Sequence, residues 1–116
     1  WARAVEWMAN RRSRLTGVPY GDQGLFMARE TFLALGGFEP IPLMEDIVMG
    51  LRLSRMNRMG QIGRMAFIDT PMTASPRRWL EEGVLRTTLR DWALAFSFVV
   101  LKVPPERLAR HYGDVR

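Results

Sequence analysis

Glycine and proline residues divide this chain into short segments, and they constrain its fold more than any other feature of the sequence. The stretch TGVPYG (16–21) ends a pattern of apolar residues at helical spacing over 1–15. The stretch EPIPL (39–43) contains two prolines, so the next helix is predicted to begin only at 44–45, and Gly60 ends it. The elements between these breaks are therefore expected to be short and separate.

Two apolar runs between the predicted helices are typical of strands. They are GLFMAR (24–29) and QIGRMAFID (61–69), and a brief helix over 30–38 follows the first run. The longest helix is expected over 79–103, and a short last helix over 105–112. The resulting order of helix, strand, helix, helix, strand, helix, helix indicates an α/β fold.

The length of 116 residues fits one small domain or one lobe of a larger one. The first residue is Trp, and Trp1, Val5 and Met8 form a helical stripe that needs a packing partner, so 1–116 is interpreted as a single partial domain. The chain has no cysteine, which excludes disulfides and thiolate metal sites and fits a reducing cytosol. His111 is the only histidine, so neither a histidine-based triad nor a zinc site is expected.

The formal net charge of +5 suggests a phosphate, nucleic-acid or anionic lipid partner. The arginines are dispersed, however, and the tightest cluster, NRRSR (10–14), is interpreted as a solvated helix end. A nucleotide diphosphate is as good a partner as a duplex, because guanidinium groups bind phosphates with two hydrogen bonds. The apolar end of the long helix, 92–103, is too short for a bilayer crossing and suits burial against a partner or shallow membrane contact.

Glu45 and Asp46 form an adjacent pair of carboxylates at the start of the helix that follows the two prolines. One interpretation is electrostatic, since carboxylates in a first turn are favoured by the helix dipole by about 0.3–1 kcal/mol. The other is chemical, since a helix start behind a loop is where α/β folds gather ligands. In that case one acid is a general base within reach of a substrate hydroxyl. Position alone favours the electrostatic interpretation.

Two further stretches carry candidate binding residues. In PYGDQGLF (19–26), Asp22 and Gln23 lie between glycines and either face a ligand or belong to a turn in which Asp22 bonds its own backbone. In SPRRW (75–79), the arginines and the indole suit a diphosphate and a sugar face. The alternative for this stretch is a junction with a buried Trp and surface arginines, and taken alone that alternative is favoured.

Three stretches of the sequence follow one another along the chain: GDQGLFMARETFLALGGF (21–38), EPIPLMEDIVMGLRL (39–53) and SPRRW (75–79). This order resembles the C-terminal half of family 2 glycosyltransferases, which are inverting nucleotide-sugar enzymes of the GT-A fold. The closest resemblance is to the small bacterial branch known as radical-SAM/selenodomain-associated glycosyltransferases. It implies the acceptor-side part of a nucleotide-diphospho-sugar transferase-like fold, with a mixed sheet and flanking helices.

The resemblance also implies roles for the acidic stretches. Asp46 matches the second acid of the family's Glu-Asp pair and would be the general base that takes the proton from an acceptor hydroxyl. Glu45 would orient the acceptor or hold the local geometry. Asp22 and Gln23 would lie on the wall between the donor sugar and the acceptor.

Arg78 and Trp79 match the last two residues of the family's QxxRW pattern, which implies a place near the acceptor and the departing diphosphate. Ser75 stands where that pattern has Gln, a departure from the processive synthases. The chain also contains no DxD, the motif that holds a divalent cation (Mg²⁺ or Mn²⁺) and the nucleotide in this family. The cation and its ligands are therefore expected in a full-length enzyme, upstream of Trp1, and the fragment alone is predicted to be inactive.

The expected partners are a nucleotide-sugar donor and a hydroxyl acceptor, and no nucleic acid. The expected location is the cytoplasm, with peripheral contact at the inner face of the membrane left open, as is homo-oligomer formation through the helix from Trp92 to Val103. The alternative function is a non-catalytic basic module that docks on anionic membrane or nucleic acid. A transferase needs Asp46, Asp22 and Arg78 to converge on one cleft, whereas a docking module needs a single basic face.

Overall fold

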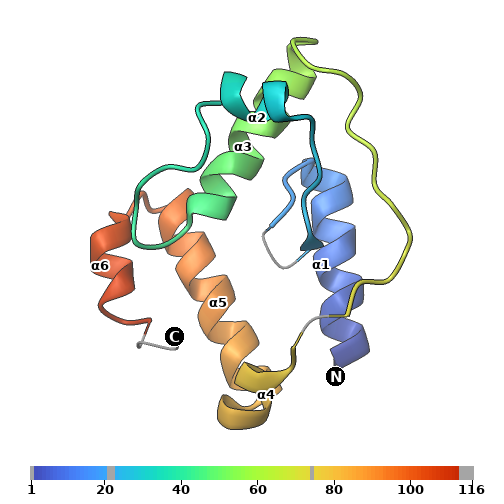
Figure 1. Ribbon diagram of the computed structural model, residues 1–116. Helices are drawn as coiled ribbons and strands as arrows, with labels where there is room; N and C mark the ends of the chain where they lie inside the picture. The colour runs from blue at the N-terminus through green and yellow to red at the C-terminus, as the bar shows by residue number, and fades with distance from the viewer. Residues whose placement is uncertain (1, 21–22, 74, 113–116) are drawn as a thin grey trace.

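The computed structural model describes residues 2–20, 23–73 and 75–112, and within these ranges the chain is built from helices alone (Figure 1). The expected α/β fold with a mixed sheet is therefore wrong, since no strand forms in the described parts of the chain. The helices of these parts are α1 (Ala2–Thr16), α2 (Arg29–Ala34), α3 (Glu45–Arg58), α4 (Arg77–Glu82), α5 (Val84–Val99) and α6 (Pro105–Ala109).

The two runs predicted as strands, 24–29 and 61–69, are irregular segments, apart from the first residue of α2 at position 29. A strand is stable only when its backbone groups pair with a neighbouring strand, and apolar composition does not supply that pairing. Phe26 and Ile68 are largely exposed, whereas a sheet packed on a core would bury such side chains. One backbone N–H of the second segment, that of Met65, instead donates to Asn57 Oδ1 of α3 at 3.3 Å.

Helix α3 is the central element, and its bounds agree with the breaks that the sequence predicts. Met44 precedes it with a φ of 72°, and Gly60 follows it with a φ of 66°. Its first turn and its middle pack into different apolar clusters. The first cluster contains Met44, Ile47, Leu94 and Leu108, which joins α3 to α5 and α6; the second contains Leu35, Met49 and Leu53, which joins α3 to the end of α2.

Arg52 reinforces the second cluster. Its guanidinium donates to the carbonyl oxygens of Leu35 and Gly37, at 3.2 and 3.4 Å, and forms an ion pair with Glu39. Carbonyls at the end of a helix have no partner within that helix, so a cation that reaches them stabilises the helix end. One side chain of α3 thus ends α2 and fixes the chain on the approach to the prolines.

Helix α3 also packs against the segment that leaves α1. Gly50 is buried there, and Ser54 Oγ donates to the Thr16 carbonyl at 3.4 Å. The absence of a side chain at position 50 allows a close approach, because a Cβ built there would lie 2.4 Å from the Pro19 carbonyl oxygen and 3.0 Å from Val18 Cγ1. This contact orients α1 relative to α3.

The helix predicted over 79–103 is divided. Gly83 ends α4 and precedes α5, with φ 85° and ψ 139°, a combination that residues with a Cβ rarely adopt. The apolar periodicity continues across this break, which is why the sequence pattern did not reveal it. Among the helices of the described segments, none is both long and apolar enough to cross a membrane.

Helix α1 lies on one side of the molecule and α5 and α6 lie on the other (Figure 1). The accessible surface is 8930 Å² for 13.4 kDa, whereas a compact protein of this mass exposes roughly 6,500 Å². Several large apolar side chains, among them Leu15, Leu80 and Phe96, are more than half exposed. The chain thus leaves apolar surface that another molecule or segment can cover.

The contact at Gly50 gives a test of this arrangement. Alanine favours a helix over glycine by about 1 kcal/mol, but overpacking against backbone costs about 1–3 kcal/mol. We therefore expect Gly50→Ala to lower the free energy of unfolding, measured by urea denaturation. Gly63→Ala is the control, since a Cβ there meets nothing within 4 Å. A stabilised Gly50→Ala variant would show that α3 does not pack on Val18 and Pro19.

Candidate functional site

A cavity of about 1280 Å³ occupies the centre of the chain and is the candidate functional site. Its wall is formed by α1, the loop after α1, the start of α3, the segment that leads into α4, and α5. Ligand cavities are typically about 300–1,000 Å³, so this one has room for a ligand with several groups. Of the residues predicted from the sequence, it is lined by Gln23, Glu45, Asp46, Arg78 and Trp79. Asp22, the remaining one, lies outside the described residues.

Glu45 and Asp46 occupy the first turn of α3, where this helix meets the cavity. Glu45 is exposed and Asp46 is half-buried. Asp46 Oδ1 accepts a hydrogen bond from the backbone N–H of Ile47 at 2.8 Å, as expected for an acid at a helix start. Asp46 also lines the cavity, so a role at the helix start and a role toward a ligand are compatible.

Met44, immediately before these acids, has an unusual backbone conformation. Its φ is 72°, which is uncommon for a residue with a long side chain, yet the side chain is buried in the first apolar cluster. Such conformations cost about 1–3 kcal/mol and persist where the surrounding structure holds them, often at functional sites. Packing of Met44 thus sets the direction in which α3 starts.

Gln23 is engaged in contacts within the protein. Its Oε1 accepts hydrogen bonds from the Ser13 hydroxyl at 2.5 Å and from the backbone N–H of Tyr20 at 3.2 Å, and its Nε2 donates to Asn10 Oδ1 at 3.2 Å. These bonds tie the loop after α1 to α1 itself. Gln23 is therefore held by contacts within the protein, whereas the turn proposed for Asp22 lies outside the described residues.

Arg12 is a cavity-lining residue that the sequence interpretation missed. Its guanidinium carbon lies 3.4 Å from the centroid of the Tyr20 ring, a cation–π contact. Arg11 is exposed, as expected of a solvated helix end, whereas Arg12 is half-buried and lines the cavity. Arg14 is exposed, forms an ion pair with Asp69 and also lines the cavity. The cluster NRRSR shows no difference among its arginines, so only the structure distinguishes the burial of Arg12 from that of its neighbours.

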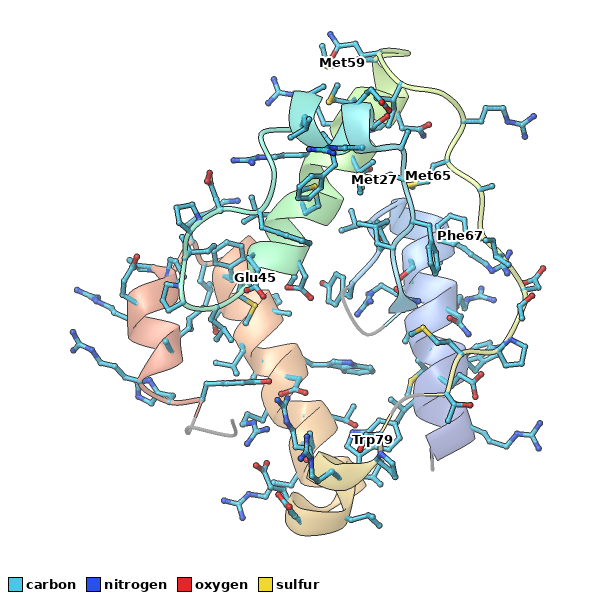
Figure 2. All side chains as sticks on the ribbon, viewed as in Figure 1. Met27, Glu45, Met59, Met65, Phe67 and Trp79 are labelled. Carbon is cyan, nitrogen blue, oxygen red and sulfur yellow. The ribbon has the colours of Figure 1, made fainter. Side chains whose placement is uncertain are left out.

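Arg78 and Trp79 project from α4, and both are half-buried. Figure 2 shows Trp79 beside α4 and Glu45 at the start of α3. No strand precedes α4 in the described residues, so the predicted junction between a strand and a helix is wrong in its strand. Trp79 is half-buried instead of buried, only Arg77 of the two arginines is exposed, and Arg78 and Trp79 both line the cavity.

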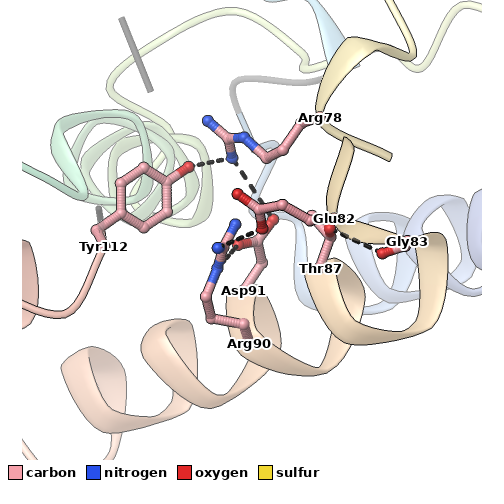
Figure 3. Close-up of polar contacts among 7 residues, drawn as sticks. All are labelled: Arg78, Glu82, Gly83, Thr87, Arg90, Asp91 and Tyr112. Atoms are coloured by element: carbon pink, nitrogen blue, oxygen red, sulfur yellow. Dashed lines mark hydrogen bonds and ion pairs between the residues drawn. The ribbon is translucent and has the colours of Figure 1, made fainter. Parts of the chain in front are cut away.

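A cluster of charged residues surrounds Arg78 where α4, α5 and the segment after α6 meet (Figure 3). Arg78 Nη1 donates to the Tyr112 hydroxyl oxygen and lies 3.8 Å from Asp91 Oδ2. Arg90 Nη1 donates to Glu82 Oε2 at 2.5 Å, and its Nε lies 3.5 Å from Asp91 Oδ1. Tyr112 is 34 positions from Arg78, so no sequence spacing could have revealed their contact.

Asp91 is the titratable group of this cluster whose pKa is displaced. Partial burial raises the pKa of its carboxyl above the ordinary value, and the neighbouring Arg90 and Arg78 offset part of this effect. The folded chain therefore holds a proton at Asp91 more tightly than the unfolded chain does.

No group of three or more metal-binding side chains gathers within the described ranges. Among the described residues, Glu45 and Asp46 have no third such ligand beside them.

No protein family model, curated protein or solved structure matches this chain. The functional argument therefore depends on the geometry of the cavity and on the resemblance of the sequence motifs.

Asp91→Asn tests the displaced pKa. The stability contributed by a raised carboxyl pKa is present below the unfolded value of 3.8 and is lost as the pH rises through the folded-state pKa. Asparagine does not titrate, so the melting temperature of Asp91→Asn relative to the unmodified chain should rise between about pH 3.5 and pH 7. Glu106→Gln on α6 is the control. A relative melting temperature that falls over this range would mean that the arginines outweigh burial.

Proposed function

We propose that this chain forms the acceptor side of an inverting glycosyltransferase, with Asp46 as the general base. The observation that carries the proposal is that Glu45, Asp46, Arg78 and Trp79, from two elements distant in sequence, line the same cavity. These residues are also the ones through which the sequence resembles family 2 glycosyltransferases. The α/β fold expected from that resemblance has no part in the proposal.

The chemistry follows from the types of side chain in the cavity. The Asp46 carboxylate accepts the proton of the acceptor hydroxyl as its oxygen attacks the anomeric carbon of the donor. The bond from that carbon to the diphosphate oxygen breaks, and its electron pair leaves with the diphosphate. Attack opposite to the leaving group inverts the configuration at the anomeric carbon.

The other cavity residues have complementary roles. The Arg78 guanidinium stabilises the negative charge that develops on the diphosphate, since fixed cations in a partly enclosed site favour a charged transition state. The Trp79 indole offers an apolar face to a sugar ring. Glu45 is near enough in sequence to Asp46 to orient the acceptor. The remaining donor site and the divalent cation belong to a longer protein in this proposal.

The geometry favours a transferase over a module that docks on anionic membrane or nucleic acid. Docking requires a basic face and has no use for carboxylates directed at a cavity. Here Glu45, Asp46 and Arg78 line the same cavity, which supports a transferase, while Asp22 lies outside the described residues. Peripheral membrane contact and pairing through the helix from Trp92 to Val103 are compatible with either function.

Asp46→Asn in the full-length protein tests the proposal. Because asparagine cannot accept the proton, kcat for transfer from a panel of nucleotide sugars should fall by about 10²- to 10⁴-fold, with little change in the KM of the donor. The assay measures nucleotide release and sugar transfer to hydroxyl acceptors. Glu30→Gln, an exposed acid on α2, is the control and should leave the rate unchanged.

Two outcomes would contradict the proposal. An undiminished rate in Asp46→Asn would remove Asp46 from the reaction. Absence of transfer by the unmodified protein from every donor, together with binding to anionic vesicles or nucleic acid that collapses with added salt, would favour the docking alternative.

A further inference from the structure

We propose that Tyr112 and Asp91 are positioning residues that hold the Arg78 guanidinium where it binds a phosphate group of the ligand. This inference rests on the proposed function, which places a diphosphate in the cavity. It adds Asp91 from α5 and Tyr112 from the segment after α6. Neither residue belongs to one of the sequence motifs described above. The evidence is the set of contacts around Arg78 (Figure 3).

Helix α4 cannot hold Arg78 in place by itself. It has six residues, from Arg77 to Glu82, and isolated helices of this length are not stable. The Arg90–Glu82 ion pair fixes the end of α4 on α5, and the Thr87 hydroxyl donates to the Gly83 carbonyl at 2.9 Å. These contacts fix the backbone near Arg78, but they leave its long side chain to be ordered by other groups.

Tyr112 supplies the main contact to that side chain. Its hydroxyl oxygen accepts a hydrogen bond from Arg78 Nη1, and the Arg78 guanidinium carbon lies 4.9 Å from the centroid of its ring. A phenol is neutral, so it orients the guanidinium without cancelling the charge that attracts phosphate. The ring also contacts Arg90, whose guanidinium carbon is 5.3 Å from the centroid.

Asp91 supplies a weaker, second contact. It lies 3.8 Å from Arg78 and 3.5 Å from Arg90, distances of ion pairs without a short hydrogen bond. By contrast, Arg90 is paired with Glu82 at 2.5 Å. Arg78 is thus the less neutralised of the two arginines and the one in the motif that resembles the transferases.

The direction of these contacts fits phosphate binding. Within the described part of the chain, both polar contacts of Arg78 use Nη1. A guanidinium has donors on three nitrogens, so Nε and Nη2 can form the paired hydrogen bonds that phosphate oxygens favour. Arg78, Asp91 and Tyr112 all line the cavity, so a bound phosphate group would meet Arg78 beside the two groups that hold it.

The test is a double-mutant cycle on binding of inorganic pyrophosphate to the full-length protein, measured by calorimetry at low salt. Arg78→Ala should weaken binding by about 10- to 100-fold, and Tyr112→Phe, which keeps the ring, by about 3- to 10-fold. In the Arg78→Ala background, Tyr112→Phe should have no further effect. Asp91→Asn should weaken binding by less than Tyr112→Phe, because the lost contact to Arg78 is partly offset by the loss of a negative charge that repels phosphate.

Two controls separate positioning from general effects. Arg86→Ala removes an exposed charge of α5 that does not line the cavity, and it should leave pyrophosphate affinity unchanged. Arg78→Lys keeps the charge without the paired donors and should recover only part of the affinity. Melting temperatures of all variants show whether a loss of affinity accompanies a loss of folding.

The inference is overturned if Arg78→Ala and Arg78→Lys both bind pyrophosphate normally. It is also overturned if Tyr112→Phe has no effect, or if it has the same effect with and without Arg78. Because the readout is pyrophosphate binding, it is independent of sugar transfer. If Asp46→Asn kept its full transfer rate, Asp46 would not be the general base, but the pyrophosphate-binding result would still stand. Conversely, normal pyrophosphate binding by the Arg78 variants would overturn this inference without contradicting the role of Asp46.

Discussion

The packing of α3 against three neighbours is the constraint on which the rest of the structure depends. Its first turn joins the cluster shared with α5 and α6, its middle joins the end of α2, and its glycine lies against the loop after α1. No other element of the described chain contacts both apolar clusters. Since the candidate acids occupy the first turn of the same helix, the packing that joins these elements also places Glu45 and Asp46.

Helix positions could be predicted from the sequence where breakers and apolar periodicity agree. The bounds of α1 and α3 and the start of α6 follow from glycines and prolines whose effect is local, whereas α6 ends at Ala109 and not at the predicted position 112. The strands could not be predicted in this way, because a strand needs a partner and neither 24–29 nor 61–69 carries information about one. The division between α4 and α5 was also missed, since the side-chain pattern runs through it and only the backbone at Gly83 departs.

The candidate site was predictable to a similar extent. Asp46, Glu45, Arg78 and Trp79 stand in recognisable stretches, and all of them line the cavity. Arg12, Asp91 and Tyr112 were missed because their importance depends on contacts between distant segments, or on a difference in burial among neighbouring arginines. The local sequence thus indicates the candidate site residues, whereas tertiary contacts indicate which residues position their side chains.

Because Gly83 has no Cβ, it can adopt the backbone conformation that orients the cavity wall. A side chain there would meet no neighbour within 4 Å, so the constraint is purely one of backbone torsion. Any other residue would favour the ordinary right-handed helical angles, and α4 and α5 would then tend to join into one straight rod. The Trp79 indole and the Arg78 guanidinium on α4 would then move away from the cavity. The bend between α4 and α5 therefore depends on glycine, the one achiral residue, at position 83.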